Sequence, residues 1–198
     1  FKNNSIRNGS LCGVFVHDCG QGVFQNNDIS DNVLAGVEIS VGGNPTMTGN
    51  KIHHGKDPVK VGVHDDGLGK GNGVLVHESG QGVFEKNEIF HNASFGMEIA
   101  KGGNPTCRNN DIRDSMDTGV YCHDSAEGSF EGNSIYQNKT ANIEVRSSAN
   151  TKFRKNTIRD GKDRGILVRE DGRGVFTEND IYGHQSVGLE VKKSGNPT

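Results

Sequence analysis

One short sequence motif repeats along the chain at a nearly fixed interval. The motif is F-x-x-N-x-I in outline, and its asparagine and isoleucine occur in all eight copies. Copies follow one another every 23 residues, except for one step of 37 residues. A period in this range is typical of a solenoid, in which each repeat packs only against its neighbours. The repeated asparagines are Asn4, Asn27, Asn50, Asn87, Asn110, Asn133, Asn156 and Asn179.

A second signature, G-V-x-V in outline, begins nine residues after each asparagine. Apolar and polar residues alternate in these runs, and a period of two indicates half-buried strands rather than helices. Glycines and asparagines between the runs disfavour a helix further. Each unit therefore holds two or three short strands joined by turns. Such a unit is too small to bury its own apolar face and must stack on copies of itself.

Parallel stacking of these units gives a β-helix. We predict an all-β, right-handed parallel β-helix of eight coils, a single domain over residues 1–198, with equivalent positions of successive coils about 4.8 Å apart. The phenylalanine and isoleucine positions then form interior columns. Because the chain begins and ends on a coil boundary without a polar cap, we expect it to be a segment of a longer repeat array.

The asparagine in every coil has two explanations. In the first, the side-chain amides stack as a ladder along a turn, which satisfies both donor and acceptor between coils. In the second, asparagine is present because it tolerates left-handed turn geometry. The two explanations are compatible, and the sequence leaves both open.

Composition limits the partners of such a rod. Residues of the AVILMFWYC set make up only 31%, but counting the 29 glycines with them brings the share into the range of folded domains. The net charge of -3 offers no excess of positive charge to a phosphate backbone, so nucleic acid is not expected as a partner. No apolar run approaches the roughly 18 residues that cross a bilayer, so no membrane contact is expected.

Successive coils alternate between two types of sequence. One type ends in G-x-G-V, as at residues 20–23, 80–83 and 172–175, and the other ends in N-P-T, as at residues 44–46, 104–106 and 196–198. These phrases resemble the CASH repeats, the parallel β-helix repeats of carbohydrate-binding proteins and sugar hydrolases. The string at residues 76–82 is similar to phrases in the β-helix regions of F-box proteins. The resemblance implies a right-handed β-helix that recognises substrates for a ubiquitin ligase, although no F-box lies within these residues.

One outward column alternates between apolar residues and glutamates without exception. Two residues further on, the same face carries His17, His77 and His123 in the first five coils and Arg or Lys in the last three. We interpret this face as a binding strip for an extended peptide or polysaccharide, with apolar platforms between charged positions. The alternative is that duplication of a two-coil unit copied these surface residues without a function. The column consists of Phe15, Glu38, Leu75, Glu98, Tyr121, Glu144, Leu167 and Glu190.

Fourteen extra residues, at about residues 58–71, are the one departure from the repeat. Solenoids commonly place binding loops at such departures. The insertion contains His64, Asp65 and Asp66 and precedes the strand with Leu75, so we expect it to overhang the strip. No EF-hand spacing and no closely paired Cys/His motif accompanies these residues. We therefore expect a solvated loop, with no metal and no cofactor.

Parallel β-helices of the pectate-lyase and epimerase types act on polysaccharides, so an enzyme must also be considered. Their chemistry needs a base near the sugar C5 proton and a cation to neutralise the uronate. Here Glu, His and Arg repeat along columns without forming one distinct cluster, which favours binding over catalysis but does not decide between them. If the chain is an enzyme, His77, Glu98 and His64 are the expected catalytic group.

The sequence thus predicts a non-catalytic recognition module for a protein or peptide partner. The alternative is a polysaccharide-binding or polysaccharide-modifying β-helix. Cys107 and Cys122 fall in interior columns, and no two cysteines share a column in adjacent coils, which favours the cytoplasm or nucleus. Sequons at four asparagines keep secretion as an alternative. These sequons begin at Asn3, Asn8, Asn92 and Asn138.

Overall fold

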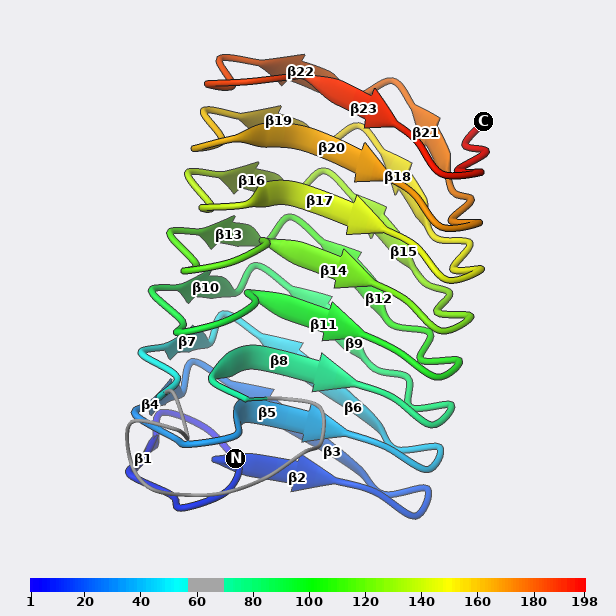
Figure 1. Ribbon diagram of the computed structural model, residues 1–198. Helices are drawn as coiled ribbons and strands as arrows, with labels where there is room; N and C mark the ends of the chain where they lie inside the picture. The colour runs from blue at the N-terminus through cyan, green and yellow to red at the C-terminus, as the bar shows by residue number, and fades with distance from the viewer. Residues whose placement is uncertain (57–69) are drawn as a thin grey trace.

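A computed structural model of the chain describes residues 1–56 and 70–198. Strands wind through these residues as a stack of parallel coils, with the first coil at one end and the last at the other (Figure 1). The described residues include no helix of the length and apolarity that a membrane span requires. Most of the predicted insertion, with His64, Asp65 and Asp66, lies outside the described residues, so its place beside the strip stays a prediction.

Each coil contributes one strand to each of three parallel sheets, except that the eighth coil contributes to two. Sheet A consists of β3 (Gln21–Gln25), β6 (Asn44–Thr48), β9 (Val83–Glu85), β12 (Thr106–Arg108), β15 (Ser129–Glu131), β18 (Lys152–Arg154) and β21 (Val175–Thr177). Sheet B consists of β1 (Ser5–Arg7), β4 (Asp28–Ser30), β7 (Lys51–His53), β10 (Glu88–Phe90), β13 (Asp111–Arg113), β16 (Ser134–Tyr136), β19 (Thr157–Arg159) and β22 (Asp180–Tyr182). Sheet C consists of β2 (Val14–Val16), β5 (Ala35–Ile39), β8 (Asn72–Val76), β11 (Met97–Ile99), β14 (Val120–Cys122), β17 (Ala141–Val145), β20 (Arg164–Val168) and β23 (Leu189–Val191). We number the coils 1 to 8 in chain order, so that coil 1 holds β1, β2 and β3.

The strand register keeps equivalent repeat positions opposite one another. Ile89 pairs with Ile52 on one side and with Ile112 on the other. The long step causes no shift, because Val37 of β5 pairs with Val74 of β8 across the extra residues. Because the register repeats every 23 residues, identical side chains lie in columns. The predicted right-handed parallel β-helix is confirmed.

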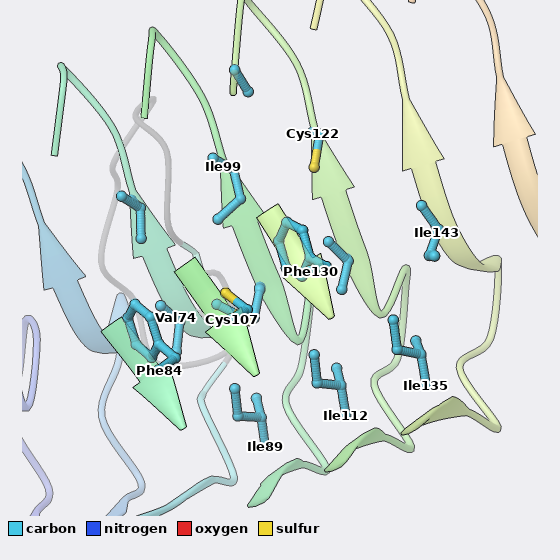
Figure 2. Packing of buried hydrophobic residues seen from close by; sticks show 14 of the residues in the cluster. Val74, Phe84, Ile89, Ile99, Cys107, Ile112, Cys122, Phe130, Ile135 and Ile143 are labelled. Carbon is cyan, nitrogen blue, oxygen red and sulfur yellow. The ribbon is translucent and has the colours of Figure 1, made fainter. Parts of the chain in front are cut away.

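The interior is filled by these columns (Figure 2). Ile89, Ile112 and Ile135 are fully buried, one above the other. The rings of Phe130 and Phe153 stack with centroids 4.8 Å apart, so each coil covers the apolar surface of the next. Cys107 and Cys122 are fully buried in the same cluster, and all four cysteines of the chain are free thiols. Burial of these columns is the main driving force for stacking.

The eight repeated asparagines form a continuous ladder between sheets A and B. The Oδ1 atom of Asn110 accepts hydrogen bonds from the backbone N–H of Asn87 and from its Nδ2, both at 3.0 Å. The Nδ2 atom of Asn110 donates to Oδ1 of Asn133 and to the carbonyl of Phe84, both at 2.9 Å. The left-handed backbone falls on the preceding residue, Asn109, with φ 55°, and on none of the ladder asparagines. Amide pairing, and not tolerance of left-handed geometry, therefore explains these asparagines.

A second, sparser ladder joins sheets B and C. The Oδ1 atoms of Asn32, Asn92 and Asn138 accept backbone N–H groups from the preceding coil at 2.9 to 3.1 Å. In coil 8 this place is taken by His184, whose Nδ1 accepts the N–H of Gly161 at 3.1 Å. Its Nε2 lies 3.2 Å from the carbonyl of Ile158 and donates to it in this tautomer. Only a neutral imidazole satisfies both contacts.

Replacing His184 with asparagine is expected to flatten the dependence of stability on pH. Burial is the largest influence on His184 and lowers its pKa, against the opposing effects of the Ile158 carbonyl and Asp160. The unfolded chain takes up this proton near the ordinary pKa of about 6.5 while the folded chain resists it, so wild-type stability decreases as pH falls through that region. The H184N variant lacks this loss. The loss is measured as the change in the urea midpoint of each protein between about pH 7 and about pH 5. An equal change in the midpoint of H184N and of the wild type would contradict the prediction.

Candidate functional site

The predicted strip lies on the outer face of sheet C and is in register throughout. Glu98 is opposite Leu75 on one side and Tyr121 on the other. None of the eight strip residues belongs to the interior cluster, so the alternation of glutamate and apolar residues runs along the outside of the rod. The strand period of two places these side chains away from the interior valines and isoleucines of the same strands.

The middle of this strip is more covered than the sequence predicts. Tyr121 is only 7% exposed, whereas Phe15 in coil 1 is 52% exposed. The ring of Phe95 lies 4.5 Å from the ring of Tyr121, and the guanidinium of Arg146 lies 5.1 Å from it on the next coil. Neighbours at the coil spacing therefore cover the apolar members. Among the strip residues, only Phe15 offers an open apolar platform.

Each glutamate of the first six coils is paired with a cation or imidazole on the following coil. Glu38 lies 3.1 Å from Nε2 of His77, and Glu144 accepts from Nε of Arg169 at 2.9 Å. Burial by itself raises the pKa of Glu38, but the hydrogen bonds from His77 and Cys12 lower it overall. The carboxylate of Glu38 is thus held as an ion by its neighbours and does not stand as a free charge on the rod.

A donor on the preceding coil contacts three of the four glutamates of the strip. Cys12 Sγ donates to Glu38 at 2.6 Å, Asn72 Nδ2 donates to Glu98 at 2.6 Å, and Arg164 Nε donates to Glu190 at 2.5 Å. Each donor lies three residues before the strip residue of its own coil, and none was among the predicted site residues. Their signal in the sequence is a fixed offset of 26 residues before each glutamate.

Two members of the predicted catalytic group lie within the described residues and have imidazole or carboxylate partners there. His77 pairs with Glu38, and Glu98 pairs with His123, because each glutamate meets the imidazole of the following coil. His64 lies outside the described residues. Among the described residues Glu98 thus has His123 as an imidazole partner, and the grouping of His77, Glu98 and His64 stays a prediction.

Coils 4 to 6 hold a cluster that no other part of the strip repeats. The side chains of Glu98 and His123 are 5% and 6% exposed and meet at 2.9 Å. The Nδ1 atom of His123 lies 3.0 Å from Asp124, and its ring stacks on Tyr121 at 4.5 Å. With Arg146 over the other part of the tyrosine, the cluster combines a phenol, an imidazole held between two carboxylates, and a cation.

Tyr121 is held as a neutral phenol in this cluster. Burial is the main reason that its pKa is raised, with Arg146 opposing and the carboxylates of Glu144 and Glu98 adding to the effect. Its hydroxyl has no hydrogen-bond partner among residues 1–56 and 70–198, and it is not one of the buried unpaired atoms. The phenol is therefore protonated at neutral pH, and its oxygen keeps some contact with solvent although the side chain is largely covered.

Accessible positive charge lies beside this cluster, towards the end of the rod. The side chains of Arg146 and Arg169 are 32% and 22% exposed, and Lys192 extends the row into coil 8. Each guanidinium keeps donors beyond those that its glutamate partner accepts. Arg146, Arg169 and Lys192 are ion-paired with Glu170, Glu144 and Glu190, so only their remaining donors are offered to an anionic group. In the part of the chain that the structure describes, no three His, Cys, Asp or Glu side chains converge as metal ligands.

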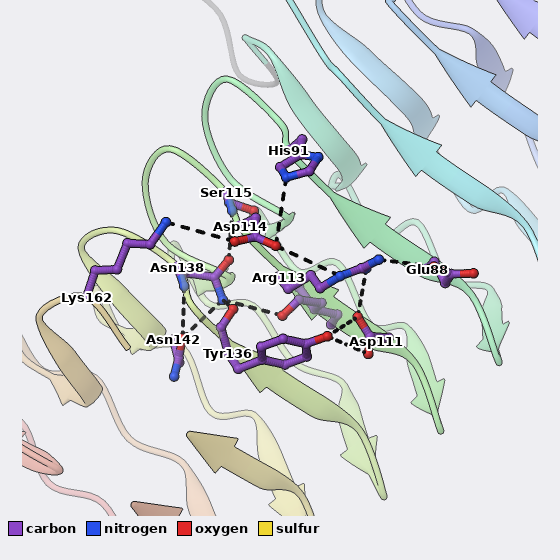
Figure 3. Close-up of polar contacts among 11 residues, drawn as sticks. Glu88, His91, Asp111, Arg113, Asp114, Ser115, Tyr136, Asn138, Asn142 and Lys162 are labelled. Atoms are coloured by element: carbon purple, nitrogen blue, oxygen red, sulfur yellow. Dashed lines mark hydrogen bonds and ion pairs between the residues drawn. The ribbon is translucent and has the colours of Figure 1, made fainter. Parts of the chain in front are cut away.

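A further column, on sheet B, was not predicted from the sequence. The ring of Phe90 stacks on His53 at 4.7 Å and carries the guanidinium of Arg113 at 4.4 Å, while Arg159 lies 3.9 Å from the ring of Tyr136. Figure 3 shows Arg113 held between acidic groups of β10 and β13. The signal was available, since the residue after each repeated isoleucine is aromatic or arginine from coil 4 onward. Because these groups satisfy one another, we assign the column to stacking of coils.

Comparison with known proteins agrees with this architecture. The family described as the right-handed β-helix region matches residues 1–141 and 99–198. The A-module of the mannuronan C-5 epimerase AlgE6 from Azotobacter vinelandii is similar in structure, with a TM-score of 0.76 and 21% identity over 99% of this chain and 56% of that chain. The A-module of AlgE4 from the same organism has a TM-score of 0.72 and 18% identity over 98% and 57%. The pectate lyase Pel9A has a TM-score of 0.53 and 13% identity over 98% and 55%.

These structural likenesses show a shared fold, and the chain spans little more than half the length of each of those chains. They extend along the whole stack of coils. The finer resemblance to CASH repeats and F-box proteins stays a prediction. The matched residues and the three parallel sheets show that the chain belongs to the family of right-handed β-helix regions.

Proposed function

We propose that the chain is the polysaccharide-binding and polysaccharide-modifying region of its protein, and that an acidic polysaccharide lies along the strip on sheet C. The observation that carries the proposal is the cluster in which Tyr121 lies between His123 and Arg146. Similar folds named as mannuronan epimerases and a pectate lyase support a uronic-acid polymer as the substrate class.

The residues of the cluster suit chemistry at a uronate. Arg146 and Arg169 would receive the sugar carboxylate, and neutralising that charge makes the C5 proton easier to remove. Tyr121, which its raised pKa keeps as a neutral phenol, would give its proton to the glycosidic oxygen that leaves C4 in an elimination. The C5 proton would pass to a water molecule at the surface of the strip, the electron pair of that C–H bond would form the C4–C5 double bond, and the phenolate would regain its proton from the water. His123 has both ring nitrogens engaged, by Glu98 and Asp124, so it acts as a positioning residue that fixes the tyrosine ring.

The protein-binding interpretation takes second place. The sequence predicts a protein or peptide partner from the resemblance to F-box proteins, but the strip offers few open apolar positions on which a protein interface could centre. The similar folds are named for action on polysaccharides. We therefore rank the polysaccharide above the protein partner.

Replacing Tyr121 with phenylalanine is expected to abolish turnover while leaving binding in place. Loss of a proton-transferring group costs about 10²–10⁴-fold in rate. Polymannuronate and polygalacturonate serve as probes, with unsaturated product followed by ultraviolet absorbance, epimer ratio by proton NMR and binding by calorimetry. Replacing Arg146 and Arg169 with glutamine should instead weaken binding.

Tyr136→Phe is the matched control, since it makes the same chemical change on sheet B, where Tyr136 lies beneath Arg159. This variant should bind and react as the wild type does. Failure of the wild type to bind either polyuronate would overturn the proposal. So would full activity of Y121F, because the tyrosine hydroxyl would then have no role in the reaction.

A further inference from the structure

A column of exposed polar side chains runs along the edge where the turns after sheet C enter sheet A. Its positions lie one coil apart, and each backbone N–H of the column donates to the preceding coil at 2.8 to 2.9 Å, which fixes the spacing at about 4.8 Å. All members point to solvent, so none is used in the interior. In coils 4 to 8 they are Asn104, Glu127, Asn150, Arg173 and Asn196.

The residue that follows each column member projects little from the surface, so the surface beside the column is depressed. This residue is Pro105, Gly128, Thr151, Gly174 and Pro197 in the same coils, and the first four are buried. A side chain cannot be added at Gly128, where φ is 116° and a Cβ atom would lie 2.9 Å from the carbonyl oxygen of Pro105. A trench parallel to the axis of the rod is the result.

Two hollows follow this trench and share Asn150 as a common wall. One has a volume of about 290 Å³ and extends from Asn104 to Lys152. The other has a volume of about 350 Å³ and extends from Asn150 to Asn196. Together they span coils 4 to 8, so a straight chain molecule lying in the trench would meet one polar side chain at each coil.

The lining is polar, and its charges balance. Glu127 and Lys152 offset each other in the first hollow, as Asp171 and Arg173 do in the second. The remaining polar groups are amides and hydroxyls, each of which can both donate and accept hydrogen bonds. Such a surface complements a neutral ligand that carries many hydroxyl groups. It has no net charge with which to attract a polyanion.

We propose that this trench is a second binding site, for an extended neutral polysaccharide, separate from the strip on sheet C. An extended peptide fits it less well, because the backbone groups of sheet A already pair between coils and offer no edge for strand addition. The amides of Asn104, Asn150 and Asn196 recur at every second coil, about 9.6 Å apart, which suits a polymer with a short, regular repeat. The site rests on sheet A and on the turns that enter it, and it does not depend on chemistry at Tyr121.

The test uses cellohexaose, xylohexaose and mannohexaose as probes, each titrated at millimolar concentration and followed by NMR of the backbone amides. At least one hexasaccharide is expected to bind and to shift signals of coils 4 to 8. The double variant N150A/R173A should weaken that binding at least tenfold. Its matched control is Q21A/N44A, which changes the same column in coils 1 and 2, outside both hollows, and should bind as the wild type does.

Two results would overturn the trench: no binding of any of the three hexasaccharides, or equal binding by N150A/R173A and the wild type. The outcome is independent of the proposal for sheet C. Polyuronate binding should be unchanged in N150A/R173A, and hexasaccharide binding should be unchanged in Y121F. If the wild type binds only one of the two kinds of ligand, the proposal for the other site is the one that fails.

Discussion

Alanine in place of Asn110 is expected to lower the free energy of unfolding by about 3–5 kcal/mol, since each buried polar group left without a partner costs about 1–3 kcal/mol. Two groups lose the hydrogen bond that Asn110 gives them, the backbone N–H of Asn87 and the carbonyl of Phe84, and the Nδ2 of Asn87 keeps only its bond to the carbonyl of Met47. All lie in the interior of the turn, where water cannot replace the lost contacts.

Asn4→Ala is the control for this variant, because the same side chain at the exposed first position of the ladder only donates hydrogen bonds. It should change stability far less. Chemical unfolding followed by circular dichroism compares the two, with the slope of the transition checked for a change in the unfolded state. Equal midpoints for N110A and N4A would show that the ladder contributes nothing beyond local turn geometry.

The second large effect is expected from Phe130→Ala, at about 3–5 kcal/mol for an aromatic side chain removed from a packed core. Phe130 is 1% exposed and stacks on Phe153 at 4.8 Å. On its other side it faces Cys107, which is already small, so no neighbour can swing in to fill the cavity. The loss should therefore fall in the upper part of that range.

Phe176→Ala provides the comparison within the same column. Phe176 stacks on Phe153 at 5.1 Å but is only partly buried, so less surface returns to water when it is removed. Its loss should be clearly smaller, and both variants are measured by the same unfolding experiment. If F130A and F176A were equally destabilised, burial along the column would not be what holds the coils together.

The sequence predicts the fold well because the fold depends on periodicity. A spacing of 23 residues that returns to isoleucine each time leaves no other arrangement for Ile89 and Ile112 than one above the other, and the pairing has that register. The asparagine ladder depends on the same spacing. Here the structure separates two explanations that the sequence left open, by placing the left-handed backbone at Asn109 and not at Asn110.

The strip could be predicted only in part. The strand period predicts which residues form its column, but it does not predict towards which neighbouring coil each side chain points. These directions pair Glu98 with His123 and Glu38 with His77, and they cover Tyr121 with Phe95. The trench on sheet A was missed for a related reason: it is made by small residues such as Gly128, whose effect is the space they leave.

The ladder has one property that concerns the molecule as a whole. Every carboxamide in it faces the same way, with its oxygen towards the preceding coil and its NH2 towards the following one, as at Asn27, Asn50 and Asn133. The dipoles of eight amides therefore add along the axis. A coil docked in reverse would set oxygen against oxygen, so the rod can be lengthened by tandem duplication but tolerates no inverted unit.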